Sequence, residues 1–136
     1  MKNVIAIASG VAAGRGRGEN ARATLATLGL EESLRLGLAK GARAETFFGL
    51  AGAGDLMLTV GSLQSRNTTL GAALGEGKPP PDALTEGAYS TAAVAALARK
   101  LDVDMPITFA LDAVLSRTET IDTAMGRLLA LLRNRP

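Results

Sequence analysis

The 136-residue sequence contains no cysteine, no histidine and no tryptophan, and aromatic residues make up only 3% of it. Without cysteine, the chain can form neither a disulfide nor a thiolate nucleophile. Without histidine, it lacks the most common general base and the usual nitrogen ligand of zinc. We therefore predict no metal site and no active site based on cysteine or histidine. The absence of cysteine also fits a cytoplasmic location.

Charge is nearly balanced, with 15 Lys and Arg residues against 13 Asp and Glu residues and a net charge of +2. Nucleic-acid binding needs a dense basic face, and here the basic residues are scattered among acidic ones. No apolar run reaches the length of a membrane-spanning helix, and residues 1–10 lack a clear signal-peptide cleavage region. We therefore expect neither a nucleic-acid partner nor a membrane span.

Hydrophobic residues make up 47% of the sequence, with alanine and leucine dominant, and this composition favours closely packed helices over a β-sandwich. We predict an all-α protein with one domain over residues 1–136 and about six or seven helices. Periodicity, glycine and proline place these helices at residues 4–13, 20–40, 44–50, 66–75, 90–100, 106–115 and from about 120 onward. The proline-rich residues 75–82 are predicted to form a surface loop.

The first apolar segment admits two interpretations. Helical spacing, with Asn3 as the N-cap, favours a helix, while Val4, Ile5 and Ile7 also suit a buried strand. The glycines that follow, at residues 14–18, read G-x-G-x-G and lie too far from the apolar run to match the dinucleotide-binding fingerprint. We favour a helix followed by a connection between helices.

The second predicted helix has leucines on its apolar face, among them Leu36 and Leu38, and Glu31 and Glu32 on its polar face. Gly29 and Gly37 each lower its intrinsic stability by about 1 kcal/mol relative to alanine. A glycine within a helix also permits a close approach of a neighbouring helix. Gly41 is the predicted stop signal.

Lys2 and Asp55 are candidates for carbonyl chemistry. Lys2 is by position most simply a solvated terminal lysine, and Asp55, in a glycine-rich segment, most simply a turn or N-cap residue. If the two side chains lie together, the Asp55 carboxylate would hold the Lys2 ammonium. The ammonium could then hydrogen-bond a carbonyl oxygen and protonate it.

Arg66 and Asn67 are candidates for anion binding, because they lie at a predicted helix start. A guanidinium binds phosphate through two hydrogen bonds, and the free N–H groups of a helix N-terminus add a preference for anions. A capped helix with a surface arginine is the simpler interpretation. Glu86 and Gly87, after the proline-rich loop, read by themselves as an ordinary turn.

Taken together and in order, these segments resemble the C-terminal domain of bacterial NAD(P)-dependent glycerol-3-phosphate dehydrogenase. The similar segments are residues 2–7, 14–23, 49–59, 65–67, 86–87 and 101–107. The sequence departs from the family at residues 68–69, where basic residues are common, and at residues 88–91, where a Val-Arg-Thr type of segment is common.

The resemblance implies an all-helical fold like the C-terminal domain of 6-phosphogluconate dehydrogenase, in an enzyme that interconverts dihydroxyacetone phosphate and sn-glycerol 3-phosphate. It implies Lys2 and Asp55 as catalytic residues. The implied substrate-binding residues are Lys2, Asn3, Asp55, Thr59, Arg66 and Asn67, and the implied cofactor contacts are Arg66 and Glu86.

The resemblance further implies NAD or NADP as cofactor, bound mainly by an N-terminal Rossmann domain that we expect to be absent from this chain. We accordingly expect this chain alone to be inactive. A small phosphate substrate, a homodimer and a cytoplasmic role in phospholipid synthesis are also implied. Two alternatives stay open: a non-catalytic helical module for self-association, and the helical domain of a related dehydrogenase with another substrate.

Overall fold

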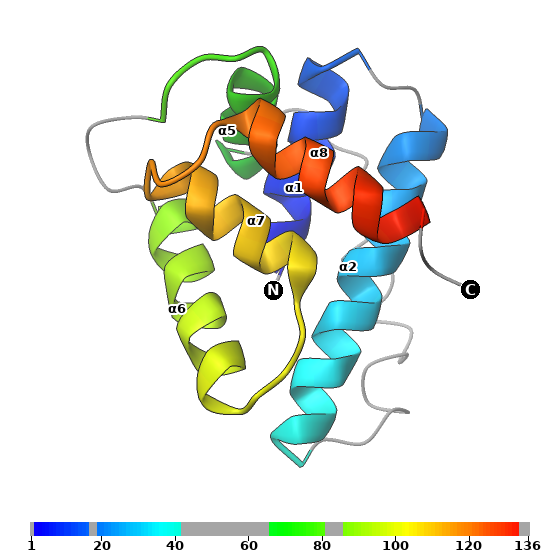
Figure 1. Ribbon diagram of the computed structural model, residues 1–136, viewed down its shortest axis with the longest axis vertical. Helices are drawn as coiled ribbons and strands as arrows, with labels where there is room; N and C mark the ends of the chain where they lie inside the picture. The colour runs from blue at the N-terminus through cyan, green and yellow to red at the C-terminus, as the bar shows by residue number, and fades with distance from the viewer. Residues whose placement is uncertain (1, 17–18, 42–65, 81–85, 134–136) are drawn as a thin grey trace.

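The structure, a computed structural model, describes residues 2–16, 19–41, 66–80 and 86–133, and these residues contain six helices and no strand (Figure 1). The helices are α1 (Lys2–Gly14), α2 (Glu19–Ala39), α5 (Arg66–Gly75), α6 (Glu86–Lys100), α7 (Pro106–Leu115) and α8 (Ile121–Arg133). The all-α prediction is therefore confirmed for this part of the chain. The predicted helix at residues 44–50 lies outside the described residues.

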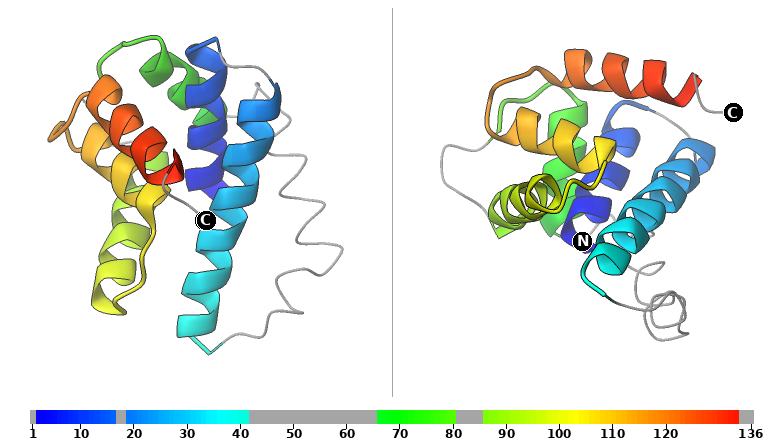
Figure 2. Two further views of the ribbon diagram at one scale, coloured as in Figure 1. Left: turned by 45° about the vertical axis from the view of Figure 1, so that its right-hand side comes forward. Right: turned by 60° about the horizontal axis from the view of Figure 1, so that its bottom comes forward.

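Helix α1 forms the centre of the domain and packs against α2, α5, α6 and α7 (Figures 1 and 2). Every residue from Val4 to Ala12 is buried, which explains why this segment is apolar on all sides and also reads as a strand. Ile7 and Val11 belong to the main core, together with Leu74, Leu111, Val114 and Leu128. The helical interpretation of this segment is thus confirmed.

Glycines bring α1 and α5 into backbone contact. A β-carbon added to Gly71 would lie closer than 3.0 Å to the backbone of Ile7, and one added to Gly75 would meet Val11 equally closely. From the α1 side, Gly10 lies against the backbone of Thr68 and Ala72. Residue numbers rise together along both helices, so α1 and α5 are parallel and begin at the same end of the domain.

Helix α2 approaches α1 at Gly29, where an added β-carbon would lie 2.7 Å from the Ile5 side chain. The inference that this glycine allows a close helix contact is confirmed. The polar face predicted for α2 is wrong at Glu32, which is only 1% exposed, and the apolar face is wrong at Leu38, which is 49% exposed. Packing against α7, described next, explains the burial of Glu32.

Glu32 caps the N-terminus of α7 from across the fold. Its carboxylate accepts hydrogen bonds from the backbone N–H of Ile107 at 2.7 Å, the backbone N–H of Thr108 at 3.1 Å and the Thr108 hydroxyl at 2.9 Å. Helix α7 has no local side-chain cap, because Met105 stands at the N-cap position and Pro106 follows it. The distant carboxylate therefore satisfies N–H groups that the helix leaves free.

Burial raises the pKa of Glu32, while the hydrogen bonds from Ile107 and Thr108 and the positive charge of Arg35 act in the opposite direction. Arg35 lies one turn further along α2, and its Nε donates a 3.0 Å hydrogen bond to the backbone carbonyl of Asp104. The C-terminal half of α2 is thereby held to the connection between α6 and α7.

Most helix ends agree with the sequence signals, but the starts of α1 and α6 do not. Helix α6 begins at Glu86, four residues before the predicted start, so Glu86 and Gly87 form its first turn instead of an isolated turn. Gly41, the predicted stop of α2, has a φ of 92°. Asp102 and Arg117, which follow α6 and α7, take the same left-handed conformation with φ of 57° and 65°.

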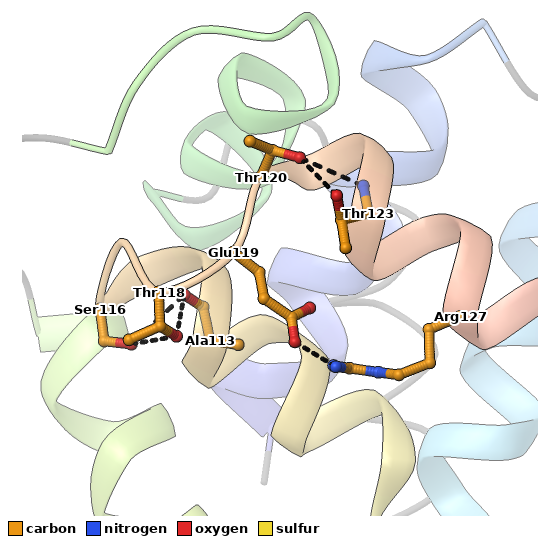
Figure 3. Close-up of polar contacts among 7 residues, drawn as sticks. All are labelled: Ala113, Ser116, Thr118, Glu119, Thr120, Thr123 and Arg127. Carbon is orange, nitrogen blue, oxygen red and sulfur yellow. Dashed lines mark hydrogen bonds and ion pairs between the residues drawn. The ribbon is translucent and has the colours of Figure 1, made fainter.

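The connection into α8 is held by local polar contacts (Figure 3). The Thr120 hydroxyl accepts a 3.2 Å hydrogen bond from the backbone N–H of Thr123, so Thr120 is the N-cap of α8. This agrees with the predicted helix start near residue 120. Glu119 forms an ion pair with Arg127, two turns into the helix. These contacts orient α8 alongside α7 (Figure 1).

The glycine contact between α1 and α5 predicts that Gly71→Ala lowers the free energy of unfolding by about 1–3 kcal/mol, because the new methyl group meets backbone that cannot rotate away. The matched control is Gly126→Ala on α8, where an added β-carbon meets open space. The control should stabilise the protein by up to about 1 kcal/mol. Urea unfolding of both variants measures the difference, and equal effects would contradict the packing argument.

The burial of Glu32 predicts a particular pH dependence of stability. Its pKa in the folded state is raised above the ordinary value of 4.5, so its stabilising contribution is complete below that value and is lost as pH rises through the folded-state pKa. The free energy of unfolding of the wild type, relative to Glu32→Gln, should therefore fall as pH rises above the ordinary pKa of 4.5. Denaturant unfolding at successive pH values measures it. A relative stability that rises with pH would show the opposite pKa shift.

Candidate functional site

The described part of the predicted site is a hydrogen-bonded network between three helices. The amide Nδ2 of Asn67 donates to Oδ1 of Asn3 at 2.9 Å, and Nδ2 of Asn3 donates to the hydroxyl of Ser90 at 3.1 Å. These side chains come from α5, α1 and α6, and all three are partly buried. The network joins residues that lie 87 positions apart in the sequence.

The fold brings these residues together for two reasons. The parallel contact between α1 and α5 places the second residues of the two helices, Asn3 and Asn67, side by side. Helix α6 approaches closely because Gly87 has no side chain, and an added β-carbon there would overlap the Asn67 amide oxygen and press on Ile7. The first turns of three helices therefore meet at one place.

This arrangement favours an anion. The first N–H groups of a helix have no partner within the helix, and the helix dipole places partial positive charge at that end. Three such ends converge at the network formed by Asn3, Asn67 and Ser90. Arg66, the exposed first residue of α5, adds a full positive charge beside Asn67. Glu86 is the exposed first residue of α6 and adds an acceptor near the same end.

The predicted site residues divide into three groups. Asn3 and Asn67 are hydrogen-bonded to each other, and Arg66 and Glu86 begin the helices on either side of them. Lys2 is the first residue of α1, and its side chain lies outside the described residues. The other two predicted residues, Asp55 and Thr59, also lie outside the described part of the chain.

One prediction about this region is wrong and one residue was missed. Asn3 is not the N-cap of α1, because the helix already begins at Lys2, and its side chain instead bridges α5 and α6. Ser90 was predicted only as a helix start. Because α6 begins one turn earlier, Ser90 lies on its inner side, facing Asn3. No local sequence signal identifies this role.

A separate pocket of about 490 Å³ lies at the opposite end of α5. It is formed by residues 77–80, by residues 117–122, and by Leu74 and Val114. None of the predicted site residues that the structure describes lines it. Its mixed lining, with Lys78 and Arg117 balanced by Glu119 and Asp122, does not single out one kind of ligand.

Within the described residues, no three acidic side chains come together as ligands for a metal ion. The same part of the chain contains no helix with the length and apolar character needed to cross a bilayer.

Comparison with known proteins identifies the class of protein to which this architecture belongs. The structure superimposes on the crystal structure of glycerol-3-phosphate dehydrogenase from Coxiella burnetii with a TM-score of 0.84 and 44% sequence identity. The match covers 94% of this chain and 41% of that one. The fold is thus that of the helical part of a dehydrogenase.

The family is equally clear from sequence. The family model described as NAD-dependent glycerol-3-phosphate dehydrogenase C-terminus matches residues 1–126, so the chain belongs to this family. It is 47% identical over 136 residues to glycerol-3-phosphate dehydrogenase [NAD(P)+] of Parvibaculum lavamentivorans, covering 96% of this chain and 41% of the relative. It is 51% identical over 135 residues to the enzyme of that name from Methylibium petroleiphilum, covering 95% and 40%.

The chain thus spans about two-fifths of the length of the relatives it matches, and the resemblance to this family is confirmed. The relatives are named as dehydrogenases, and these comparisons give no support to a non-catalytic module for self-association or to the helical domain of a dehydrogenase with another substrate.

The amide network predicts a measurable coupling between Asn3 and Asn67. Asn67→Ala leaves the amide oxygen of Asn3 without its donor and should lower the free energy of unfolding by about 1 kcal/mol. The double variant Asn3→Ala/Asn67→Ala should lose less stability than the sum of the losses of the two single variants, by at least about 0.5 kcal/mol. Asn20→Ala, at an exposed position on α2, is the control and should be additive with Asn67→Ala. Additivity of the Asn3 and Asn67 changes would argue against the network.

Proposed function

We propose that this chain is the substrate-binding domain of a dehydrogenase that interconverts dihydroxyacetone phosphate and sn-glycerol 3-phosphate with NADH or NADPH. The observation that carries the proposal is the meeting of three helix N-termini at the amide network of Asn3 and Asn67, beside Arg66. Such a place suits a phosphate group, because the helix ends and the guanidinium all favour negative charge.

Within this proposal, Arg66 binds the substrate phosphate and Asn3 and Asn67 lie beside it. The hydrogen bond between the two asparagines fixes both side chains before substrate arrives, so less conformational entropy is lost on binding. Ser90 supports this arrangement by accepting the second hydrogen bond of Asn3.

Lys2 is proposed as the residue that hydrogen-bonds the substrate carbonyl oxygen and supplies a proton as negative charge develops there. Its position at the first residue of α1 puts it next to Asn3 in the sequence and at the same end of the helix as the network. Asp55 is proposed to hold the Lys2 ammonium, with Thr59 in its hydrogen-bonded surroundings. These roles rest on the family resemblance.

The residues of this end of the domain also fit a dinucleotide. A guanidinium suits a pyrophosphate, and a carboxylate accepts hydrogen bonds from ribose hydroxyls; Arg66 and Glu86 are both exposed and available for such contacts. The nicotinamide cofactor supplies the hydride when it is bound. We propose that most of its binding energy comes from a Rossmann domain outside this chain, and that this chain alone is inactive.

The biological setting follows from the family. We propose a homodimer in the bacterial cytoplasm whose product, sn-glycerol 3-phosphate, supplies phospholipid synthesis. Membership of the chain in the glycerol-3-phosphate dehydrogenase family supports this setting.

A thermal-shift titration with sn-glycerol 3-phosphate tests the phosphate site. The ligand should raise the melting temperature of the wild-type chain in a saturable manner. Arg66→Ala should weaken the apparent affinity by about tenfold or more, because it removes the charged phosphate contact. Lys40→Ala, an exposed lysine after α2, should leave the affinity unchanged.

Two results would contradict this proposal. One is equal loss of affinity in the Arg66→Ala and Lys40→Ala variants, which would indicate a general effect of charge. The other is an equal response to glycerol, which lacks the phosphate.

A further inference from the structure

The Ser90 hydroxyl forms a different hydrogen bond from the other hydroxyl groups of α2 and α6. Those groups donate to the backbone carbonyl four residues earlier, which is a common bond of serine and threonine inside a helix. They belong to Thr24, Thr27, Ser33 and Thr91, and their bonds measure 2.7–3.0 Å. Ser90 instead accepts a 3.1 Å hydrogen bond from the Asn3 amide. Its oxygen is therefore engaged with the amide network and not with its own helix.

This bond leaves the Ser90 hydroxyl proton without an acceptor. A serine hydroxyl can donate one hydrogen bond and accept others, and the bond from Asn3 uses only its capacity to accept. In the part of the chain that the structure describes, Ser90 has no further hydrogen bond. The side chain is partly buried, where a polar group without a partner is unfavourable. The proton is thus available to an acceptor that the described residues do not supply.

The hydrogen bonds of the amide network all run toward Ser90. Asn67 donates to Asn3, and Asn3 donates to Ser90. Gly87 favours this direction, because its missing side chain leaves the space next to the Asn67 amide oxygen, so that the amide nitrogen is turned to Asn3. Hydrogen bonds that follow one another in this way polarise each other. An acceptor bound at the Ser90 end would therefore strengthen the whole series.

The surroundings of Ser90 favour an anionic oxygen as this acceptor. The first turns of α1, α5 and α6 converge at the network, and each helix N-terminus carries partial positive charge. Arg66 adds a full positive charge beside Asn67. A hydrogen bond from a hydroxyl group to a charged oxygen is shorter and stronger than one to a neutral oxygen. A phosphate oxygen therefore gains more here than a hydroxyl or carbonyl oxygen does.

We propose that the Ser90 hydroxyl donates a hydrogen bond to a phosphate oxygen of the bound substrate. This contact rests on the phosphate site put forward above, and it adds to that site a residue that the family resemblance does not include. The phosphate is then held from α5 by Arg66 and from α6 by Ser90. Ser90 accordingly has two roles: its oxygen orients Asn3, and its proton binds the ligand.

The first test measures the affinity for sn-glycerol 3-phosphate by thermal-shift titration. Ser90→Ala should weaken the affinity about tenfold, because it removes a hydrogen bond to a charged group. Ser90→Thr keeps a hydroxyl group and should stay within about threefold of the wild type. Ser116→Ala removes the same atom at an exposed position after α7 and should leave the affinity unchanged. Far-UV circular dichroism checks that the variants are folded. Equal affinities of Ser90→Ala and the wild type would overturn the proposal.

A second test separates a direct contact from an effect through Asn3. If Ser90 only orients Asn3, then Ser90→Ala has no further effect once Asn3 is already replaced by alanine. If Ser90 contacts the phosphate, Ser90→Ala should weaken the affinity of the Asn3→Ala variant again, by about threefold or more. The same titration measures all four proteins of this cycle. No further loss in the double variant would show that Ser90 is a positioning residue alone, and would overturn the direct contact.

Inorganic phosphate identifies the part of the substrate that Ser90 contacts. If the bond goes to a phosphate oxygen, Ser90→Ala should weaken the affinity for inorganic phosphate by the same factor as that for sn-glycerol 3-phosphate. Competition between the two ligands in the thermal-shift assay gives both values. An unchanged affinity for inorganic phosphate, together with a weakened affinity for sn-glycerol 3-phosphate, would place the contact on the glycerol part and overturn the assignment to phosphate.

The outcomes also separate this inference from the proposed function. A saturable response of the wild type that Arg66→Ala weakens and Ser90→Ala does not would support the phosphate site and overturn the role of Ser90. A wild type that does not respond to sn-glycerol 3-phosphate would overturn the phosphate site, and the role of Ser90 with it.

Discussion

The backbone contact between α1 and α5 is the constraint on which the rest of the structure depends. Gly10, Gly71 and Gly75 remove the side chains that would hold the two helices apart, and the close approach fixes both their direction and their register. With that register set, Asn3 and Asn67 are adjacent and can form their hydrogen bond. A shift of one residue along either helix would separate the two amides and displace the charged residue beside them.

The second organising contact is made by a buried carboxyl group. A buried carboxylate is costly unless it is fully hydrogen-bonded, and Glu32 meets this condition by accepting three hydrogen bonds at the start of α7. Helix α7 in turn gains a cap that its own residues, Met105 and Pro106, do not provide. The buried carboxyl group on α2 and the N-terminus of α7 therefore supply the hydrogen-bond partners that each lacks alone.

The helices themselves were largely predictable, and the reasons are local. Pro106 marks the start of α7, Gly41 follows the end of α2, and Thr120 caps α8, because backbone conformation at these points depends mainly on the residue present. Prediction failed where packing overrides local preference. Glu86 and Gly87 read as a turn, yet they begin α6, because Gly87 is the residue that fits against Asn67.

By itself, the sequence determined the all-α class, the family, and the residue types that could bind a phosphate, since composition, periodicity and motif order are properties of the chain. Only the tertiary structure decided that Asn3 bridges two other helices, that Ser90 completes the network and that Glu32 is buried. Each of these depends on contacts between residues far apart in the sequence. Their geometry is set by how closely glycine lets whole helices approach, which no local pattern encodes.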